Sequence, residues 1–190
     1  MTKNRIEAYS DAVIAILITI MVLELKVPHG IELSALRPLI PVFLSYVLSF
    51  IYLGIYWNNH HHLFQAVEHI KGGTLWANAH LLFWLSLIPF ATSWMGENHF
   101  APWPVALYGF VLFCCAVAYS ILVRVLISHH DNDSTLARAI GNDRKGNISL
   151  VCYLAAIFLT FVSTWLACAI YIGAAILWLV PDQRIESKVN

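Results

Sequence analysis

The N-terminal part of the chain reads RIEAYSD at residues 5–11 and continues directly into AVIAILITIMVL at residues 12–23. The second stretch is apolar apart from one threonine, as in a membrane-spanning helix. Four of the seven residues in the first stretch are polar or charged. Charged groups at the entry of a membrane helix are costly unless other parts of the protein receive them. The two stretches therefore predict a membrane protein in which several helices pack together.

The composition supports the same class. The chain has 190 residues, of which 59% are hydrophobic and 12% charged, with a mean hydropathy of +0.70. Soluble domains are about 25% charged. We expect one membrane domain over residues 1–190, with no separate soluble module and no cleavable signal. The four cysteines lie in apolar runs, so neither a disulfide framework nor a zinc site is expected.

The hydropathy pattern predicts an all-α integral membrane protein. Its apolar segments cover about residues 10–27, 39–57, 74–95, 103–127 and 148–180. As one helix the last segment would be on the order of 50 Å long, against a hydrocarbon core of roughly 30 Å. We therefore expect two spans there, with a turn near residues 163–165. Six transmembrane helices are predicted, and five is the alternative.

Basic residues predict the orientation. If residue 1 is cytoplasmic, only Lys26 and Arg37 of the eleven basic residues lie outside. The inner ones are Lys3, Arg5, Lys71, Arg124, Arg138, Arg144, Lys145, Arg184 and Lys188. Such asymmetry places both termini and the hydrophilic loop 128–147 in the cytoplasm.

Four segments in the first half of the chain form recognisable motifs: Arg5-x-x-x-Tyr9-Ser10-Asp11, the exit Leu23-Glu24-Leu25-Lys26-Val27-Pro28, Trp57-x-Asn59-His60-His61-x-Leu63-Phe64 after the second span, and Asn78 through Pro89-Phe90. These motifs resemble the transmembrane protein 175 family of potassium-permeable channels from endolysosomes and bacteria. Tyr9 stands where the family usually has phenylalanine. The resemblance covers the first half of the chain and implies the bacterial form, a single six-helix unit that assembles as a homotetramer in the cell membrane.

The resemblance also implies that the first helix lines a central pore. Counted from the motif arginine, the apolar constriction falls on Ile16, the neighbouring threonine on Thr19, and the next layers on Ile20 and Leu23. A helical wheel independently puts Ile16, Ile20 and Leu23 within about 60° of one another, with Thr19 at the edge. Such a stripe on an apolar helix is also typical of lipid-facing or packed surface. Rings of large apolar side chains can gate a pore by excluding water.

Polar residues near the cytoplasmic ends of the first three spans are expected to form a structural network, which could also control opening. The expected members are Arg5, Tyr9, Ser10, Asp11, Trp57, Asn59, His60, His61 and Asn78. Asp11 lies about 140° around the helix from Ile16, so we expect it to face neighbouring helices and not the pore.

Glu24 has two interpretations. Four copies could form an acidic collar at the outer mouth that concentrates cations, or each could pair with Lys26 or a lipid headgroup. His60, His61 and His62 suggest metal binding, but three consecutive helical residues point about 100° apart and cannot converge on one ion. No metal is therefore predicted.

The leading hypothesis is a potassium-preferring cation channel with no cofactor, whose permeant ion is K⁺ and whose surroundings are membrane lipids. A secondary or proton-coupled transporter is the alternative, although the first helix lacks the Gly or Pro breaks typical of transporters. An enzyme is not expected, because no nucleophile–base pair is present. Nucleic-acid binding is not expected either, because no basic stripe is present.

Overall fold

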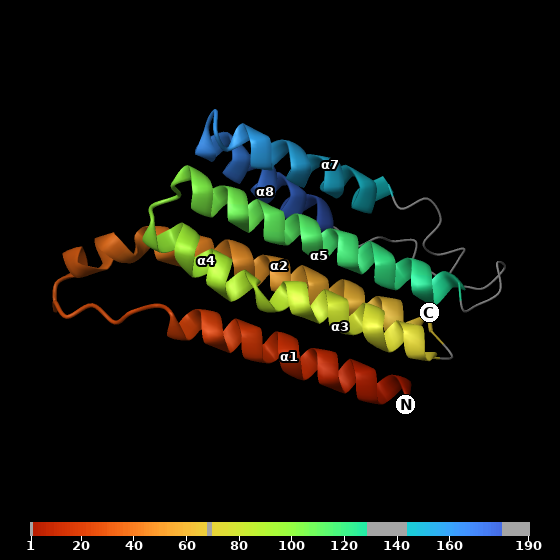
Figure 1. Cartoon of the computed structure of the whole chain (residues 1–190). Coiled ribbons are helices and arrows are strands. Elements are labelled where there is room, and N and C mark those ends of the chain that lie inside the picture. The colour runs from red at the N-terminus through yellow and green to blue at the C-terminus, as the bar shows by residue number, and fades with distance from the viewer. Residues whose placement is uncertain (1, 68–69, 129–143, 180–190) are drawn as a thin grey trace.

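The computed structural model describes residues 2–67, 70–128 and 144–179, and the predicted loop 128–147 and the basic residues Arg184 and Lys188 lie mostly or wholly outside these ranges. The fold is all-α, as predicted (Figure 1). Its helices are α1 (Lys3–Leu23), α2 (Ile40–Gln65), α3 (Gly72–Ser86), α4 (Ile88–Glu97), α5 (Pro102–Ser128), α7 (Arg144–Leu159) and α8 (Thr164–Leu179), with a 3₁₀ helix η1 (Leu33–Leu39) before α2.

Among the described residues, four segments are long and apolar enough to cross a membrane: Lys3–Leu23, Leu33–Gln65, Gly72–Glu97 and Pro102–Ser128. The third segment contains α3 and α4, which are separated at Leu87 just before Pro89. Proline cannot donate the next helical hydrogen bond, which explains the break.

The predicted division of the last apolar run is confirmed. α7 and α8 each have 16 residues in the described structure, and the turn between them covers Thr160 to Ser163. The Ser163 hydroxyl accepts the backbone N–H of Leu166 and so caps α8. The turn therefore comes slightly before the expected position.

Two predicted boundaries were wrong. The first helix ends at Leu23 and not near residue 27, and the backbone from Lys26 to Glu32 is not helical. The second continues to Gln65, so the Trp57–Phe64 motif forms its last turns and does not follow it. Polar side chains in those turns find partners on neighbouring helices, and this allows the helix to extend beyond its apolar part.

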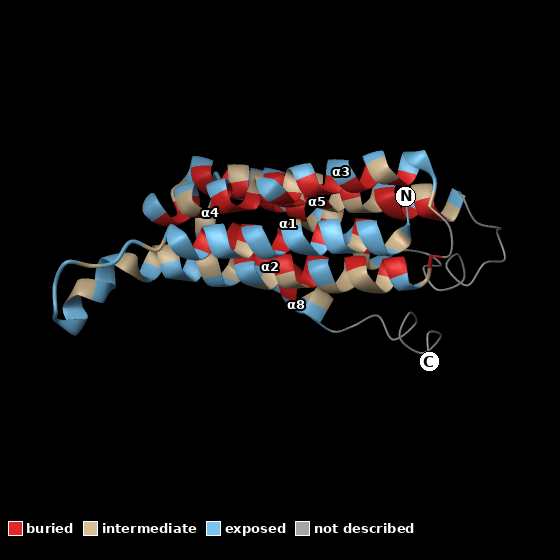
Figure 2. Ribbon diagram, turned by 90° about the horizontal axis from the view of Figure 1, so that it is seen from below, coloured by how far each residue is buried: buried red, intermediate tan, exposed pale blue. Residues whose placement is uncertain are grey.

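All the described α-helices contribute to the core. In the part between α2, α5, α7 and α8, four tyrosines are fully buried: Tyr52, Tyr108, Tyr153 and Tyr171. α1 lies at the edge of this bundle, next to α2, α3 and α4 (Figure 1). The Lys3 ammonium donates to the backbone oxygen of Gln65 at 3.1 Å, so α1 begins at the end of the bundle where α2 ends. The segment between α1 and α2 projects beyond the opposite end (Figures 1 and 2).

Candidate pore face and polar network

α1 has two different faces. Its buried residues Ile6, Ser10, Ile14, Leu17 and Met21 follow a spacing of three or four and pack against the bundle. The opposite face is exposed and forms a pale-blue band in Figure 2, which views the molecule from the α1 side. Within the described subunit, this outer face has no helix packed over it.

The four predicted constriction residues all lie on this outer face. Ile16 is 56% exposed, Ile20 41% and Leu23 79%, and Thr19 is also exposed. The Thr19 hydroxyl donates to the backbone oxygen of Ile16 at 2.8 Å. This bond fixes the hydroxyl hydrogen toward the helix and leaves the oxygen lone pairs available on the outer face.

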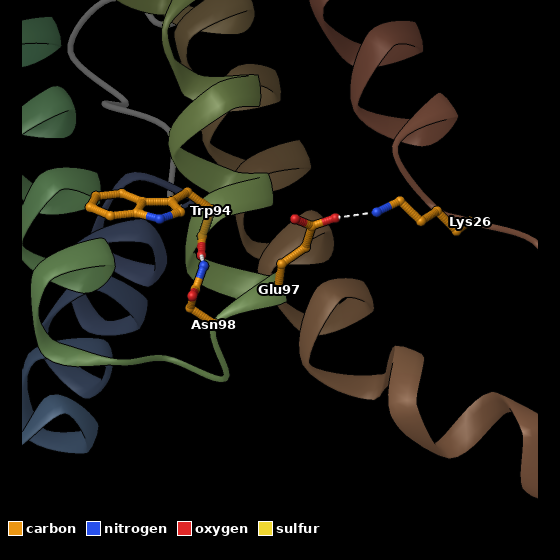
Figure 3. Close-up of polar contacts among 4 residues, drawn as sticks. All are labelled: Lys26, Trp94, Glu97 and Asn98. Atoms are coloured by element: carbon orange, nitrogen blue, oxygen red, sulfur yellow. Dashed lines mark hydrogen bonds and ion pairs between the residues drawn. The ribbon is translucent and has the colours of Figure 1, made fainter.

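At the other end of α1, Lys26 forms an ion pair with Glu97 of α4 at 2.7 Å (Figure 3). Glu24, the C-cap of α1, is exposed. Lys26 therefore pairs with Glu97 and not with Glu24, the partner suggested by the sequence. The hydrogen bond to Glu97 raises the pKa of Lys26 above its usual 10.5. Because the lysine pKa is raised, the ion pair persists through neutral pH and is lost only as the pH rises through the pKa of Lys26.

We expect Lys26→Gln to leave the melting temperature of the purified protein almost unchanged. The lysine and glutamate side chains are 75% and 46% exposed, and water screens such pairs strongly. The melting temperature is measured by following intrinsic tryptophan fluorescence while the protein is heated in detergent. A fall of many degrees would contradict the weak role assigned to the pair.

At the end where α1 begins, three buried side chains join α1, α2 and α3. The Asn78 amide nitrogen donates to the Ser10 hydroxyl at 2.9 Å, and the Asn78 amide oxygen lies 2.8 Å from Nε2 of His60. With the amide in this orientation its oxygen accepts, so His60 carries its proton on Nε2. Ser10, His60 and Asn78 are at most 3% exposed, so these bonds satisfy groups that water cannot reach.

A second contact lies nearby on the surface. The Trp57 indole nitrogen donates to a carboxylate oxygen of Asp11 at 3.0 Å, and the His61 ring stacks on Trp57 with centroids 6.1 Å apart. Asp11 therefore contacts a neighbouring helix of its own subunit, as expected from its position around α1.

Three expected members of the network are not joined to it. The Asn59 amide donates to the backbone oxygen of Ile55 on its own helix. Arg5 is exposed, and its guanidinium forms no bond with any described residue. Tyr9 is 58% exposed and has no hydrogen-bond partner in the described part of the chain. Arg5 and Tyr9 are instead on the same outer face of α1 as Ile16.

Asn78→Ala should destabilise the folded protein by about 2–4 kcal/mol, because it leaves two buried polar groups on different helices without partners. Asn59→Ala is the matched control, since its amide bonds only within α2. Thermal unfolding in detergent should show a large fall in melting temperature for Asn78→Ala and a small one for Asn59→Ala. Equal shifts in melting temperature would count against a stabilising role for the hydrogen bonds that Asn78 makes between helices.

The sequence analysis missed a second buried polar cluster. The Ser49 hydroxyl lies 2.6 Å from the Thr92 hydroxyl and 3.0 Å from that of Tyr108, which ties α2 to α4 and α5. Polar residues within apolar spans were its only sequence signal. Within residues 2–67, 70–128 and 144–179, no group of three or more potential metal ligands comes together.

The apolar helices and the buried polar contacts between them define an integral membrane protein of the helical-bundle class. The family model described as the endosomal/lysosomal potassium channel TMEM175 matches residues 5–89. A potassium channel of Chryseobacterium sp. is 53% identical over 190 residues, covering 100% of this chain and 99% of that protein. A potassium channel of Chamaesiphon minutus is 31% identical and covers 91% of each chain.

Comparison with solved structures points to the same family as the sequence comparisons. The crystal structure described as a lysosomal potassium-selective channel TMEM175 homolog from Chamaesiphon minutus superposes with a TM-score of 0.81 and 30% sequence identity, over 95% of this chain and 97% of that one. The chain belongs to the TMEM175 family.

Proposed function

We propose that this chain is a potassium-permeable cation channel whose pore forms between the α1 helices of four copies. The observation that carries the proposal is the exposed outer face of α1, which is apolar along its membrane part although its own subunit leaves it uncovered. The relatives named potassium channels support K⁺ as the permeant ion. No catalytic residue or cofactor is assigned, and the remaining outer surface contacts membrane lipids.

In this tetramer the narrowest part is a hydrophobic gate formed by rings of Ile16, Ile20 and Leu23. Such rings exclude water when they are close together. Four Thr19 oxygens lie beside the constriction and interact with dehydrating ions. Four Glu24 carboxylates form the outer mouth, where they raise the local cation concentration.

All of residues 1–190 form one channel domain with six transmembrane helices: α1, α2, α3 with α4, α5, α7 and α8. The described parts of α7 and α8 are about 24 Å long and shorter than a typical 30 Å core, so these two spans come near the lower limit. An even number of spans puts both termini on one side. The distribution of basic residues makes that side the cytoplasm of a cell-membrane protein.

The polar network of Ser10, Asp11, Trp57, His60 and Asn78 holds the cytoplasmic half of α1 against α2 and α3. Because it fixes the rotation of α1, it also controls which side chains face the pore, and in this way couples stability to opening. Arg5 and Tyr9, on the outer face of α1, take part through contacts between subunits, and His61 and Asn59 support Trp57 and α2.

The test is to reconstitute the purified chain in liposomes and to measure K⁺ flux and the reversal potential against Na⁺. We expect passive, downhill K⁺ flux with a moderate preference over Na⁺, because the chain has no Thr-Val-Gly-Tyr-Gly carbonyl filter. Flux that requires a proton or sodium gradient would support a secondary transporter instead. Absence of K⁺ flux would reject the channel.

A further inference from the structure

A cleft lies on the side of the subunit formed by α2, α5, α7 and α8, and no residue of α1 lines it. Its space is about 440 Å³, including the open mouth. The aromatic residues around it are Tyr52, Tyr56, Tyr119, Tyr153 and Trp178. This space has the size of a small ligand pocket.

Most hydrogen-bond donors around the cleft are already used within the protein. The Tyr52 hydroxyl donates to the backbone oxygen of Tyr171 at 2.6 Å. The Tyr119 hydroxyl donates to the backbone oxygen of Asn59 at 3.2 Å, and the Trp178 indole donates to the Ser149 hydroxyl at 2.8 Å. These groups shape the wall and have little capacity left for a ligand.

Tyr56 is the exception. Its side chain is only 8% exposed, yet its hydroxyl has no hydrogen-bond partner among the described residues. Every fully buried side-chain nitrogen or oxygen in the described structure has a partner, so the Tyr56 oxygen must keep an accessible side. Because Tyr56 lines the cleft, this accessible side is available to a molecule in it. A hydroxyl without a partner in the protein gains a hydrogen bond from such a molecule.

The charge and shape of the wall define the kind of molecule. None of the described residues that line the cleft is charged, so a charged ligand would lose its hydration without compensation. The rings of Tyr56 and Tyr119 meet edge to face at 6.2 Å, and those of Tyr52 and Tyr153 do the same. A further aromatic ring can extend such an arrangement favourably.

We propose that the cleft binds a neutral aromatic alcohol or phenol, whose hydroxyl bonds to the Tyr56 hydroxyl. The aromatic body of the ligand lies in the mouth against the tyrosine and tryptophan rings. This site is separate from the outer face of α1, so binding does not depend on the proposed pore.

The experiment uses the purified full chain in lipid nanodiscs and a benzyl alcohol that carries a photoreactive diazirine on its ring. Labelled residues are mapped by mass spectrometry, with and without excess unmodified benzyl alcohol. We expect the label on the cleft segments of α2, α5, α7 and α8, and we expect competition to remove it.

Tyr56→Phe keeps the ring and removes the hydroxyl, so it should weaken binding by about three- to tenfold, the value of one hydrogen bond. Tyr108→Phe makes the same change at a buried tyrosine outside the cleft and should leave labelling unchanged. Ala116→Leu should abolish labelling by filling the cleft, whereas Ala155→Leu on the exposed side of α7 should not.

Label spread over lipid-facing residues of all helices, without competition, would overturn the proposal. Saturable labelling of the cleft that Tyr56→Phe does not weaken would overturn the assigned hydroxyl contact. The Tyr56 variant should fold normally, because the hydroxyl it loses has no partner in the described subunit. A melting temperature equal to that of the wild type verifies this point.

Discussion

Ile16→Asn is expected to raise K⁺ flux in liposomes by roughly tenfold, because lowering the barrier at the constriction by about 1.4 kcal/mol has that effect on a rate. Ile16 is on the uncovered face of α1, and asparagine brings an amide that water can bond. A ring of four such residues would stay hydrated where isoleucine excludes water. The same change should reduce the preference for K⁺ over Na⁺, because both ions would then pass with more of their hydration shells.

Val22→Asn provides the control. Val22 is 44% exposed near the same end of α1 as Leu23 but lies about 120° around the helix from Ile16. It should leave the flux and the permeability ratio close to those of the wild type. Equal effects of both substitutions, or an unchanged ratio with Ile16→Asn, would count against Ile16 as the constriction.

Gly96→Ala should lower the melting temperature by several degrees, which corresponds to the roughly 1–3 kcal/mol cost of overpacking. A Cβ atom at Gly96 of α4 would lie 2.7 Å from the Cα atom of Val42 and 2.5 Å from the Ser45 hydroxyl. The first of these is backbone, so α2 and α4 would have to separate. Their close approach also brings Ser49 and Thr92 together, and the separation would weaken that bond as well.

Gly54→Ala tests whether this effect belongs to the site and not to glycine in general. Gly54 lies within α2, and an added Cβ would meet nothing within 4 Å. The substitution should be neutral or stabilising, because alanine favours the helix by about 1 kcal/mol over glycine. If both variants lost the same stability, the packing explanation for Gly96 would fail.

Local information in the sequence was sufficient to place the helices approximately. The apolar runs, the break before Pro89 and the division between α7 and α8 follow from hydropathy, proline and length, which act within one segment. The face of α1 that contains Ile16 and Leu23 was also predictable, because helical periodicity alone places these residues together. The end of α2 was not predictable from local information, because the polar residues Trp57 and His60 have their hydrogen-bond partners on other helices.

Polar residue types at one end of the bundle indicated a network, but not its pairs. Asn78 could have met any of several partners, and only the packing of α1, α2 and α3 brings it to Ser10, 68 positions away, and to His60. The pairing of Lys26 with Glu97, and the cleft in which the Tyr56 hydroxyl has no partner, likewise appear only in three dimensions. Hydropathy and periodicity are properties of neighbouring residues, whereas hydrogen-bond geometry and empty space depend on distances between helices. The sequence by itself thus determined the approximate positions of the helices and the outer face of α1, and the tertiary structure decided where α2 ends and which side chains meet.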